Sequence, residues 1–407
     1  MRVGIFGGAF DPPHRGHEKA AKTFLTFADL DLLYVIPSGD PPHKTLSSGS
    51  KGVDRLRMCA LSFLPLSEKI RVSDMEICST EKSYTYLTVE KIKKAHPEDE
   101  IFLFVGTDQF LAFETWRNFE KLLASCTLCV MDRFEDREVL LKKKESLEKD
   151  FGARCLIFEE KPYIISSTRI REEIGEKGFS VALSPKVNDD ILENDLYHSL
   201  SCAERKKAVK RARETLSKDR LSHTFSVMRE CVLLGEIFSL SEAEKKNLSL
   251  AALYHDLTKE WTPEEQKKFL EKRGEKVSED EISSPAVLHG RSAAILFREE
   301  MGPSPEYESA IFYHTTGKKE MTLKEKILFF ADFIEETRRH TVCLEMREYF
   351  YSYLPENTEE RVAFLDHCIK KVLEQTISHL KEKKFPIHPL TAFALEDLKE
   401  KTERKGL

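Results

Sequence analysis

The sequence predicts an α/β, Rossmann-like, doubly wound parallel sheet followed by an all-α helical bundle. At 407 residues the chain exceeds the length that one ordinary core supports, so we expect two domains. In the first half, short apolar runs alternate with amphipathic stretches, which favours parallel strands joined by helices. After about Tyr197 the apolar residues recur at helical spacing with little β signal, which predicts the all-α part.

The individual elements of the first half follow from its periodicity. Short apolar runs predict buried strands, and amphipathic stretches predict helices that cover the sheet. In chain order, the segments that carry this alternation are Val3–Phe6, Lys19–Phe27, Leu32–Ile36, Arg55–Leu64, Ile101–Val105, Leu128–Met131 and Cys155–Phe158. The change in character places the domain boundary between Leu196 and Ala203, which predicts domains over residues 1–198 and 199–407.

The composition is that of a soluble globular protein and argues against several classes of function. The chain is 41% hydrophobic and 33% charged, and its net charge of −6 gives no basic excess for a nucleic-acid partner. No apolar run is long enough to span a bilayer, and no signal-peptide pattern is present. We therefore expect a cytoplasmic protein without a membrane partner; the sequence is compatible with a homo-oligomer.

The cysteines do not form a recognisable framework. There are nine, and an odd number at scattered positions favours reduced thiols over disulfides. Cys126 and Cys129 form a CxxC pair, a spacing that can bind zinc or carry redox chemistry. Because this pair lies in the apolar run SCTLCVM, we interpret it as part of a buried strand.

The most informative segment is GGAFDPPHRGH, residues Gly7 to His17, directly after the apolar run Val3–Phe6. Glycines at this point let a ligand approach the backbone, and a helix that follows would direct its N-terminal amides at an anion. His14 and His17, three residues apart, share a face at the start of that helix. A strand-to-helix loop with incidental histidines is the plain alternative, but the run of informative positions favours nucleotide chemistry.

Three further motifs fall where other strands of the sheet should end. They are Pro41-Pro42-His43-Lys44, Gly106-Thr107-Asp108 and Ile165-Ser166-Ser167-Thr168-Arg169-Ile170-Arg171. Ligands of open α/β sheets bind beyond the carboxyl ends of the strands. The third motif places hydroxyls at a predicted helix start and an arginine one turn later, which suits a polyphosphate. Taken alone, this motif is equally compatible with a capped helix that binds nothing.

Together these motifs resemble the HxGH nucleotidyltransferases, and PPHK, SYT and the GTD…W spacing narrow the resemblance to nicotinate-nucleotide adenylyltransferases over about residues 1–198. The resemblance implies transfer of adenylyl from ATP, with Mg²⁺, to nicotinate mononucleotide, which gives the deamido dinucleotide of NAD synthesis and pyrophosphate. The family's acidic residue after Ser83-Tyr84-Thr85-Tyr86 is replaced here by Leu87.

The resemblance also implies roles for particular residues. His14 and His17 would hold the ATP phosphates, while Ser167, Thr168 and Arg171 would bind the leaving pyrophosphate; His14, His17 and Arg171 are the candidate catalytic residues. The residues expected to contact the nucleotide are Gly7, Gly8, Phe10, Gly106 and Asp108. The residues expected around the nicotinate nucleotide are Lys44, Thr85, Trp116 and Arg133, with the Trp116 ring available for stacking on the pyridine.

A second candidate site lies in the α-helical half, where His255-Asp256 follows an apolar stretch. The dipeptide gains weight from four more residues in largely apolar helical contexts: His223, His289, His314 and Asp332. Any one of these residues, considered alone, is more simply explained as a buried side chain that binds no metal. As a set they favour metal binding, because unpaired buried polar groups are costly. Arg220 and Lys259, at helical spacing from His223 and His255, would provide phosphate-binding neighbours.

This half resembles the HD-domain metallophosphohydrolases over about residues 203–380. HTTG and ADFIEETR look like the branch that splits diadenosine tetraphosphate into two ADP. The resemblance implies hydrolysis of dinucleoside polyphosphates at a metal, with Asp256 both catalytic and a ligand. His223, His255, Asp256 and Asp332 would hold one metal, and His289 and His314 a second. Mixed His/Asp ligands suit iron or manganese and do not exclude zinc or nickel.

Two alternatives remain open from the sequence. The first half is compatible with another acceptor, such as the amidated nicotinamide mononucleotide or phosphopantetheine. The second half is compatible with a module that senses nucleotide without turnover, although it has kept both Asp256 and Asp332.

Overall fold

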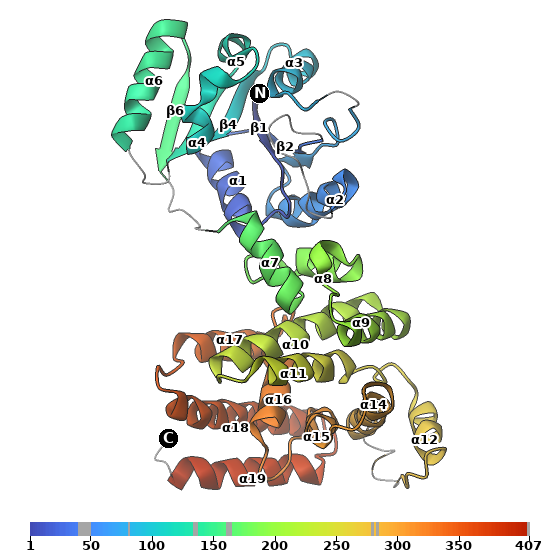
Figure 1. The fold of residues 1–407 in the computed structure, drawn as a ribbon. Helices are drawn as coiled ribbons and strands as arrows, with labels where there is room; N and C mark the ends of the chain where they lie inside the picture. Colours follow the sequence, from blue (N-terminus) through green and yellow to red (C-terminus); the bar gives the residue numbers. More distant parts are fainter. Residues whose placement is uncertain are drawn as a thin grey trace. The chain divides into compact units, whose positions relative to one another are not determined.

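A computed structural model describes residues 1–39, 50–79, 82–132, 137–159, 165–277, 281 and 285–404. The chain forms two compact units, Met1–Ser201 and Cys202–Leu407. Each unit is described by itself below, with the element labels of Figure 1. Among the described residues, no helix has the length and apolar character needed to cross a membrane.

The first unit contains a six-stranded sheet in the order β3-β2-β1-β4-β5-β6. Every neighbouring pair of strands is parallel. The strands are β1 (Arg2–Gly8), β2 (Leu32–Pro37), β3 (Ile70–Val72), β4 (Glu100–Gly106), β5 (Thr127–Asp132) and β6 (Cys155–Glu159). The predicted doubly wound sheet is confirmed, whereas β3 was not among the predicted segments.

Helices cover both faces of this sheet (Figure 1). The helices of the first unit are α1 (Arg15–Phe27), α2 (Gly52–Phe63), α3 (Thr85–Ala95), α4 (Thr107–Leu111), α5 (Phe119–Ser125), α6 (Arg137–Phe151), α7 (Ser167–Lys177) and α8 (Pro185–Glu193). Three short 3₁₀ turns complete it: Leu64–Leu66, Phe113–Thr115 and Leu196–His198. The two predicted amphipathic stretches correspond to α1 and α2.

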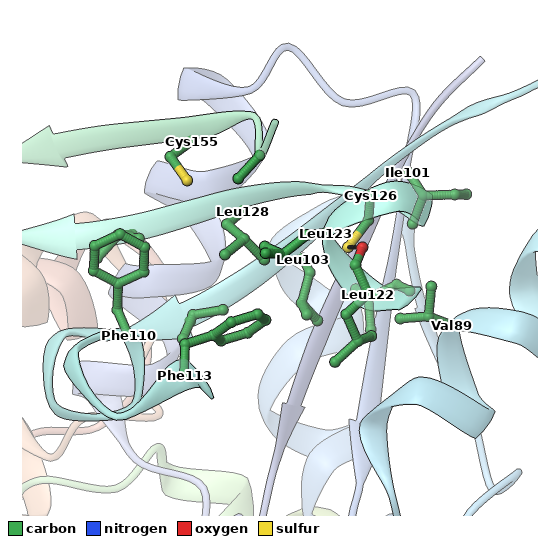
Figure 2. Packing of buried hydrophobic residues seen from close by; sticks show 14 of the residues in the cluster. Val89, Ile101, Leu103, Phe110, Phe113, Leu122, Leu123, Cys126, Leu128 and Cys155 are labelled. Atoms are coloured by element: carbon green, nitrogen blue, oxygen red, sulfur yellow. Dashed lines mark hydrogen bonds between the residues drawn. The ribbon is translucent and has the colours of Figure 1, made fainter. Parts of the chain in front are cut away.

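Side chains of β1 alternate between two apolar layers, as the period of a strand requires. Val3 and Ile5 pack in the layer that α3, α5 and α6 complete, and Phe6 packs in the layer that α1 and α2 complete. Figure 2 shows the first layer, where Leu103 of β4 and Leu128 of β5 lie beside residues of α4 and α5. Burial of these apolar side chains provides the main driving force for folding of this unit.

The CxxC pair lies within the same core. Cys129 is in β5 and Cys126 immediately precedes it, and both thiols are free and buried. Burial raises the pKa of each thiol to about 12. The interpretation of this segment as a buried strand is confirmed, and thiols with so high a pKa are poor nucleophiles.

The described part of the second unit is entirely helical, which confirms the predicted change of class. Its helices are α9 (Ala203–Thr215), α10 (Lys218–Ile237), α11 (Glu242–Tyr254), α12 (Pro263–Glu271), α14 (Pro285–Met301), α15 (Pro305–Tyr313), α16 (Leu323–Ile334), α17 (Thr341–Ser352), α18 (Thr358–Glu382) and α19 (Pro389–Arg404). Hydroxyl caps mark several helix starts: Ser241 and Thr322 each accept a hydrogen bond from the amide three residues later.

The Leu128→Ala substitution should destabilise the first unit by about 2–5 kcal/mol, because Leu128 is fully buried and a cavity would replace it. Urea denaturation would measure this through Trp116 fluorescence in a Trp261→Phe background, since the chain has two tryptophans. Leu141→Ala on α6, where the side chain is 41% exposed, is the matched control and should shift stability by less than about 0.5 kcal/mol. Equal effects of the two substitutions would contradict this account of the core.

Candidate functional site

Two adjoining cavities open at the carboxyl ends of β1 and β4, with volumes of about 380 and 330 Å³. The strand order turns from one direction to the other between these two strands, which is where open α/β sheets bind ligands. Both cavities are bordered by Gly7, Gly8, Phe104, Gln109 and Trp116. The two spaces thus share a wall and can hold two ligands side by side.

Gly7 faces this shared space. A Cβ built on Gly7 would meet no atom within 4 Å, whereas one on Gly8 would lie 3.1 Å from the Phe10 ring. A side chain at Gly7 would therefore project into the cavities, and its absence lets a ligand approach the backbone. Phe10 borders the smaller cavity, although it is 2% exposed and packs edge-on against Phe6 and Phe63.

The two histidines of the HxGH pair lie at the start of α1. His14 is the N-cap, and its backbone amide donates to Nδ1 of His17 at 3.2 Å. The two imidazole rings stack with their centroids 3.7 Å apart, and both border the smaller cavity. The expected shared face is confirmed. The positive dipole end of α1 favours an anion in this cavity.

Asp11 connects this loop to distant segments. Its buried carboxylate Oδ1 accepts hydrogen bonds from the hydroxyls of Tyr197 at 2.6 Å and Ser50 at 2.5 Å. Its backbone carbonyl accepts one from Arg171 Nη1 at 2.7 Å. The second guanidinium nitrogen of Arg171 donates to the Thr168 hydroxyl at 3.1 Å. Arg171 is thereby held against the loop that precedes α1.

Helix α7 begins at Ser167, as its motif predicts, but the cap is the preceding residue. Ser166 Oγ accepts a hydrogen bond from the amide of Arg169 at 3.2 Å. Ser166 was quoted in the motif and was not assigned a role. Ser167 and Thr168 follow in the first turn, and Ile165 borders the smaller cavity.

The larger cavity is lined by Thr85 and Trp116, both predicted from the sequence. The Trp116 indole N–H donates to Gln109 Oε1 at 3.3 Å, which fixes the ring at the shared wall. Gly106 borders the smaller cavity; Asp108, its companion in the motif, is exposed on α4 and borders neither. The two predicted residues Lys44 and Arg133 lie outside the described residues.

Sequence reasoning missed two charged residues that line the larger cavity. The exposed Arg117 guanidinium lies over the Tyr84 ring, 4.8 Å from its centroid. The Glu76 carboxylate accepts a hydrogen bond from the Thr88 hydroxyl at 2.6 Å, and burial raises its pKa. Arg117 follows Trp116 directly, so its position beside the predicted stacking residue was the available signal.

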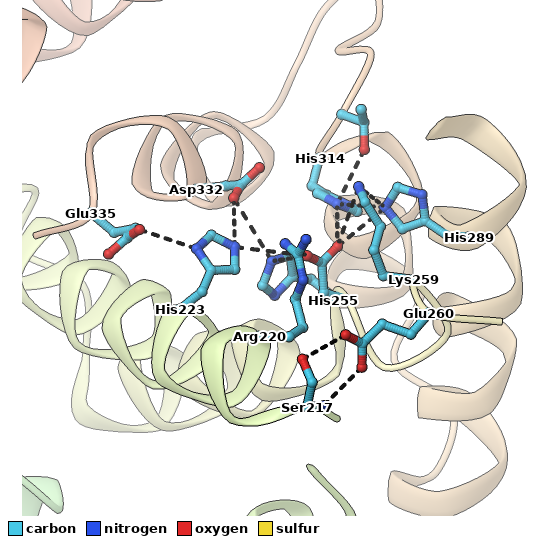
Figure 3. A network of polar contacts seen from close by, with 12 residues as sticks. Ser217, Arg220, His223, His255, Lys259, Glu260, His289, His314, Asp332 and Glu335 are labelled. Carbon is cyan, nitrogen blue, oxygen red and sulfur yellow. Dashed lines mark hydrogen bonds and ion pairs between the residues drawn. The ribbon is translucent and has the colours of Figure 1, made fainter. Parts of the chain in front are cut away.

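The second unit brings together all six residues predicted to bind metal (Figure 3). His223 lies in α10, His289 in α14 and Asp332 in α16, whereas His255 and Asp256 directly follow α11 and His314 directly follows α15. One expectation needs correction. His255, Asp256 and Lys259 lie at the helix end and in the turn after α11, because the helix stops at Tyr254, so they do not share a helix face.

Asp256 is at the centre of this cluster. Its Oδ2 lies 3.7 Å from Nε2 of both His223 and His255, and its Oδ1 lies 3.2 Å from His289 Nε2 and 3.5 Å from His314 Nε2. Asp332 Oδ1 lies 3.1 Å from His223 Nε2. The two oxygens of one carboxylate therefore face two groups of imidazoles.

The donor set fits a divalent metal. His255 and His314 direct Nδ1 at the backbone carbonyls of Ala252 and Ile311, both at 2.6 Å, which leaves Nε2 toward the centre. Three buried central atoms have no hydrogen-bond partner among the described residues: His223 Nε2, His255 Nε2 and Asp256 Oδ1. Buried polar atoms without hydrogen bonds are costly unless a cation completes the site.

The imidazoles differ in their electrostatic surroundings. Burial lowers the pKa of His255 to about 3 and that of His289 to about 4. Burial also disfavours the charged form of His223, but the adjacent carboxylates of Asp332 and Glu335 outweigh it and raise the pKa to about 9. Burial likewise opposes ionisation of Asp256, yet the nearby histidines and Lys259 hold the pKa of that carboxyl well below its usual value.

Basic side chains adjoin the cluster. Arg220 Nη1 donates to Asp256 Oδ2 at 2.9 Å, and Lys259 Nζ lies 3.1 Å from His289 Nε2 (Figure 3). Arg338, not predicted from the sequence, donates to Asp332 Oδ1 at 2.6 Å. A cavity of about 400 Å³ beside His223 is lined by Ser217, Asp219, Arg220, Glu260, Glu335, Thr337, Arg338, Arg339 and His340. The site is thus open to an anionic ligand.

Comparison with known proteins supports the family resemblance of each half of the chain. Residues 5–173 match the cytidylyltransferase-like family, and residues 220–336 match the HD domain family. A probable nicotinate-nucleotide adenylyltransferase of Fusobacterium nucleatum is 35% identical over 178 residues, which are 44% of this chain and 89% of that protein. A protein of the same description from Clostridium novyi is 38% identical over 175 residues, 42% of this chain and 86% of that protein.

Among solved structures, a predicted HD superfamily hydrolase involved in NAD metabolism from Clostridium acetobutylicum is similar at 25% identity with a TM-score of 0.43. The similarity covers 48% of this chain and 97% of that one. The sequence relatives and the family matches decide the assignment: the chain belongs to the nicotinate-nucleotide adenylyltransferase family through its cytidylyltransferase-like part, and its second part is an HD domain.

Proposed function

We propose that the chain is a bifunctional enzyme. Its N-terminal domain, residues 1–198, transfers adenylyl from ATP to nicotinate mononucleotide, and its C-terminal domain, residues 199–407, hydrolyses dinucleoside polyphosphates such as diadenosine tetraphosphate to two ADP. The observation that carries the first activity is the pair of adjoining cavities that share Gly7 and Trp116. The observation that carries the second is the six-residue His/Asp cluster beside a cavity with basic residues.

In the first reaction, ATP would occupy the smaller cavity and nicotinate mononucleotide the larger one. A phosphate oxygen of the mononucleotide attacks the α-phosphorus of ATP, the bond to the bridging oxygen breaks, and pyrophosphate leaves. Charge develops on the α-phosphoryl oxygens and on the leaving group. The positive end of the α1 dipole and the imidazoles of His14 and His17 lie where they can stabilise this charge, and Arg171, held on the Asp11 carbonyl, can bind the pyrophosphate. Mg²⁺ bound with ATP would neutralise part of the phosphate charge.

In the second reaction, Asp256 would be shared between two metal positions. His223, His255 and Asp332 would complete one, and His289 and His314 the other. Iron or manganese suits this mixed donor set and, when bound, would activate water and polarise a phosphoryl oxygen. Arg220, Lys259 and Arg338 are the chain's own groups for binding the polyphosphate and for stabilising charge on the leaving ADP.

The His17→Ala substitution should lower kcat/KM for adenylyl transfer by about 100-fold or more, because a preorganised donor at the developing charge is lost. Release of pyrophosphate from ATP and nicotinate mononucleotide would measure it. His379→Ala, which replaces an exposed histidine of α18, is the control and should leave the rate unchanged. Retention of wild-type activity by the His17 variant would contradict the proposed phosphate site.

The Arg117→Gln substitution should lower kcat/KM for nicotinate mononucleotide by about 10- to 100-fold, since a charged hydrogen bond to the pyridine carboxylate would be lost. The value for nicotinamide mononucleotide, which carries an uncharged amide, should change by less than about threefold. Lys121→Gln on α5 removes the same charge from an exposed position outside both cavities and serves as the control. Equal losses for both acceptors would exclude this role, and a wild-type preference for the amide would overturn the proposed acceptor.

Chelation should abolish hydrolysis of diadenosine tetraphosphate, and added manganese or iron should restore it with ADP as the sole product. Chromatography of the products would measure this for the full chain, beside a His255→Ala/Asp256→Ala variant that loses two central ligands. ATP plus AMP as products would contradict symmetrical cleavage. Binding without turnover under every metal would identify a nucleotide sensor instead of a hydrolase.

A further inference from the structure

His223 lies between two carboxylates that come from the same end of α16. Asp332 Oδ1 is 3.1 Å from its Nε2, and Glu335 Oε1 is 3.1 Å from its Nδ1 (Figure 3). Nε2 of His223 faces the metal cluster, and Nδ1 faces away from it. Glu335 therefore contacts the far side of the His223 ring and does not reach the position that a metal would occupy. Glu335 belongs to none of the donor groups described above.

The Glu335 carboxylate is itself rigidly held. Helix α16 ends at Ile334, and Glu335 is its C-cap with ψ of 153°, so the chain turns away there and the side chain points back toward α10. Oε2 accepts a hydrogen bond from the amide of Thr337 at 2.6 Å, and Oε1 accepts one from the Thr337 hydroxyl at 2.8 Å. Glu335 is 1% exposed, so this acceptor has little freedom to leave His223.

The partner of His223 differs in charge from those of two other imidazoles in the cluster. His255 and His314 each have a neutral backbone carbonyl at Nδ1, whereas His223 has a carboxylate. An anionic acceptor at Nδ1 holds a proton on that nitrogen, so that Nε2 is the atom left to bind a cation at the centre. It also increases the electron density that the ring can donate to a cation.

We propose that Glu335 is a positioning residue: through its hydrogen bond to Nδ1 it orients His223 and strengthens metal binding at that side of the cluster. The proposal rests on the metallohydrolase function proposed above. The hydrogen bond acts on His223 and not on His255 or His314, whose Nδ1 atoms face neutral backbone carbonyls.

The Glu335→Gln variant of the full chain should bind Mn²⁺ about 10- to 100-fold more weakly than the wild type. Isothermal titration with Mn²⁺ alone, on protein freed of metal by chelation, measures this without reference to activity. Glu336→Gln is the matched control: it removes the same charge one residue away, where Glu336 pairs with Arg229 at 3.0 Å and contacts no residue of the cluster. Its Mn²⁺ affinity should stay within about twofold.

A second variant keeps the test decisive if Glu335→Gln does not fold. Thr337→Val leaves the carboxylate in place but removes one of the hydrogen bonds that hold it, and it should weaken Mn²⁺ binding by about two- to fivefold. Wild-type affinity in a folded Glu335→Gln protein, or an equal loss in the Glu336→Gln control, would overturn the proposal while the hydrolase function stands. A wild-type chain that binds no Mn²⁺, iron, zinc or nickel would overturn both.

Discussion

A buried carboxylate must have partners, and both candidate sites depend on this constraint. In the first unit, Asp11 is 3% exposed and contacts Tyr197, Ser50 and, through its carbonyl, Arg171 beside the loop that precedes α1. In the second unit, Asp256 is 2% exposed and faces imidazoles from several helices. In each case one aspartate contacts segments that are distant in sequence, and these contacts hold the candidate functional groups in place.

The parts of the fold that the sequence predicts are those governed by local periodicity. Continuous apolar runs such as Ile101–Val105 need burial on both faces, and the parallel sheet provides it. Strand β3 escaped prediction because Ile70–Val72 is only three residues long and contains an arginine, so its apolar signal is too short. The end of α11 was misplaced because no glycine or proline follows Tyr254 before Pro263 to mark a helix end, and the turn there positions residues of the cluster.

The parts of the sites that the sequence does not predict are long-range pairs. Tyr197 and Asp11 are 186 residues apart, and His223 and Glu335 are 112 apart, so no spacing rule links them. Ligand types such as His255-Asp256 can be recognised because their chemistry is rare in apolar contexts. Glu335 and Arg338 lie in a stretch rich in charged residues, ADFIEETRR, where solvent exposure is the ordinary expectation. Only the way α16 ends against α10 distinguishes them from surface charges.

Charged side chains surround the metal cluster on both sides of Asp256, and their positions bear on how a phosphate ligand would approach. Asp332 and Glu335 flank His223, whereas Lys259 adjoins His289 at the opposite side of Asp256. Arg220 and Arg338 pair with Asp256 and Asp332 on the His223 side, so guanidinium groups that can bind an anion lie on that side and an ammonium group lies on the Lys259 side. Asp256 cannot be removed without affecting both, because its two oxygens face both groups. Glu335 contacts one imidazole only, which makes it the residue through which one half of the cluster can be weakened while the other keeps its ligands.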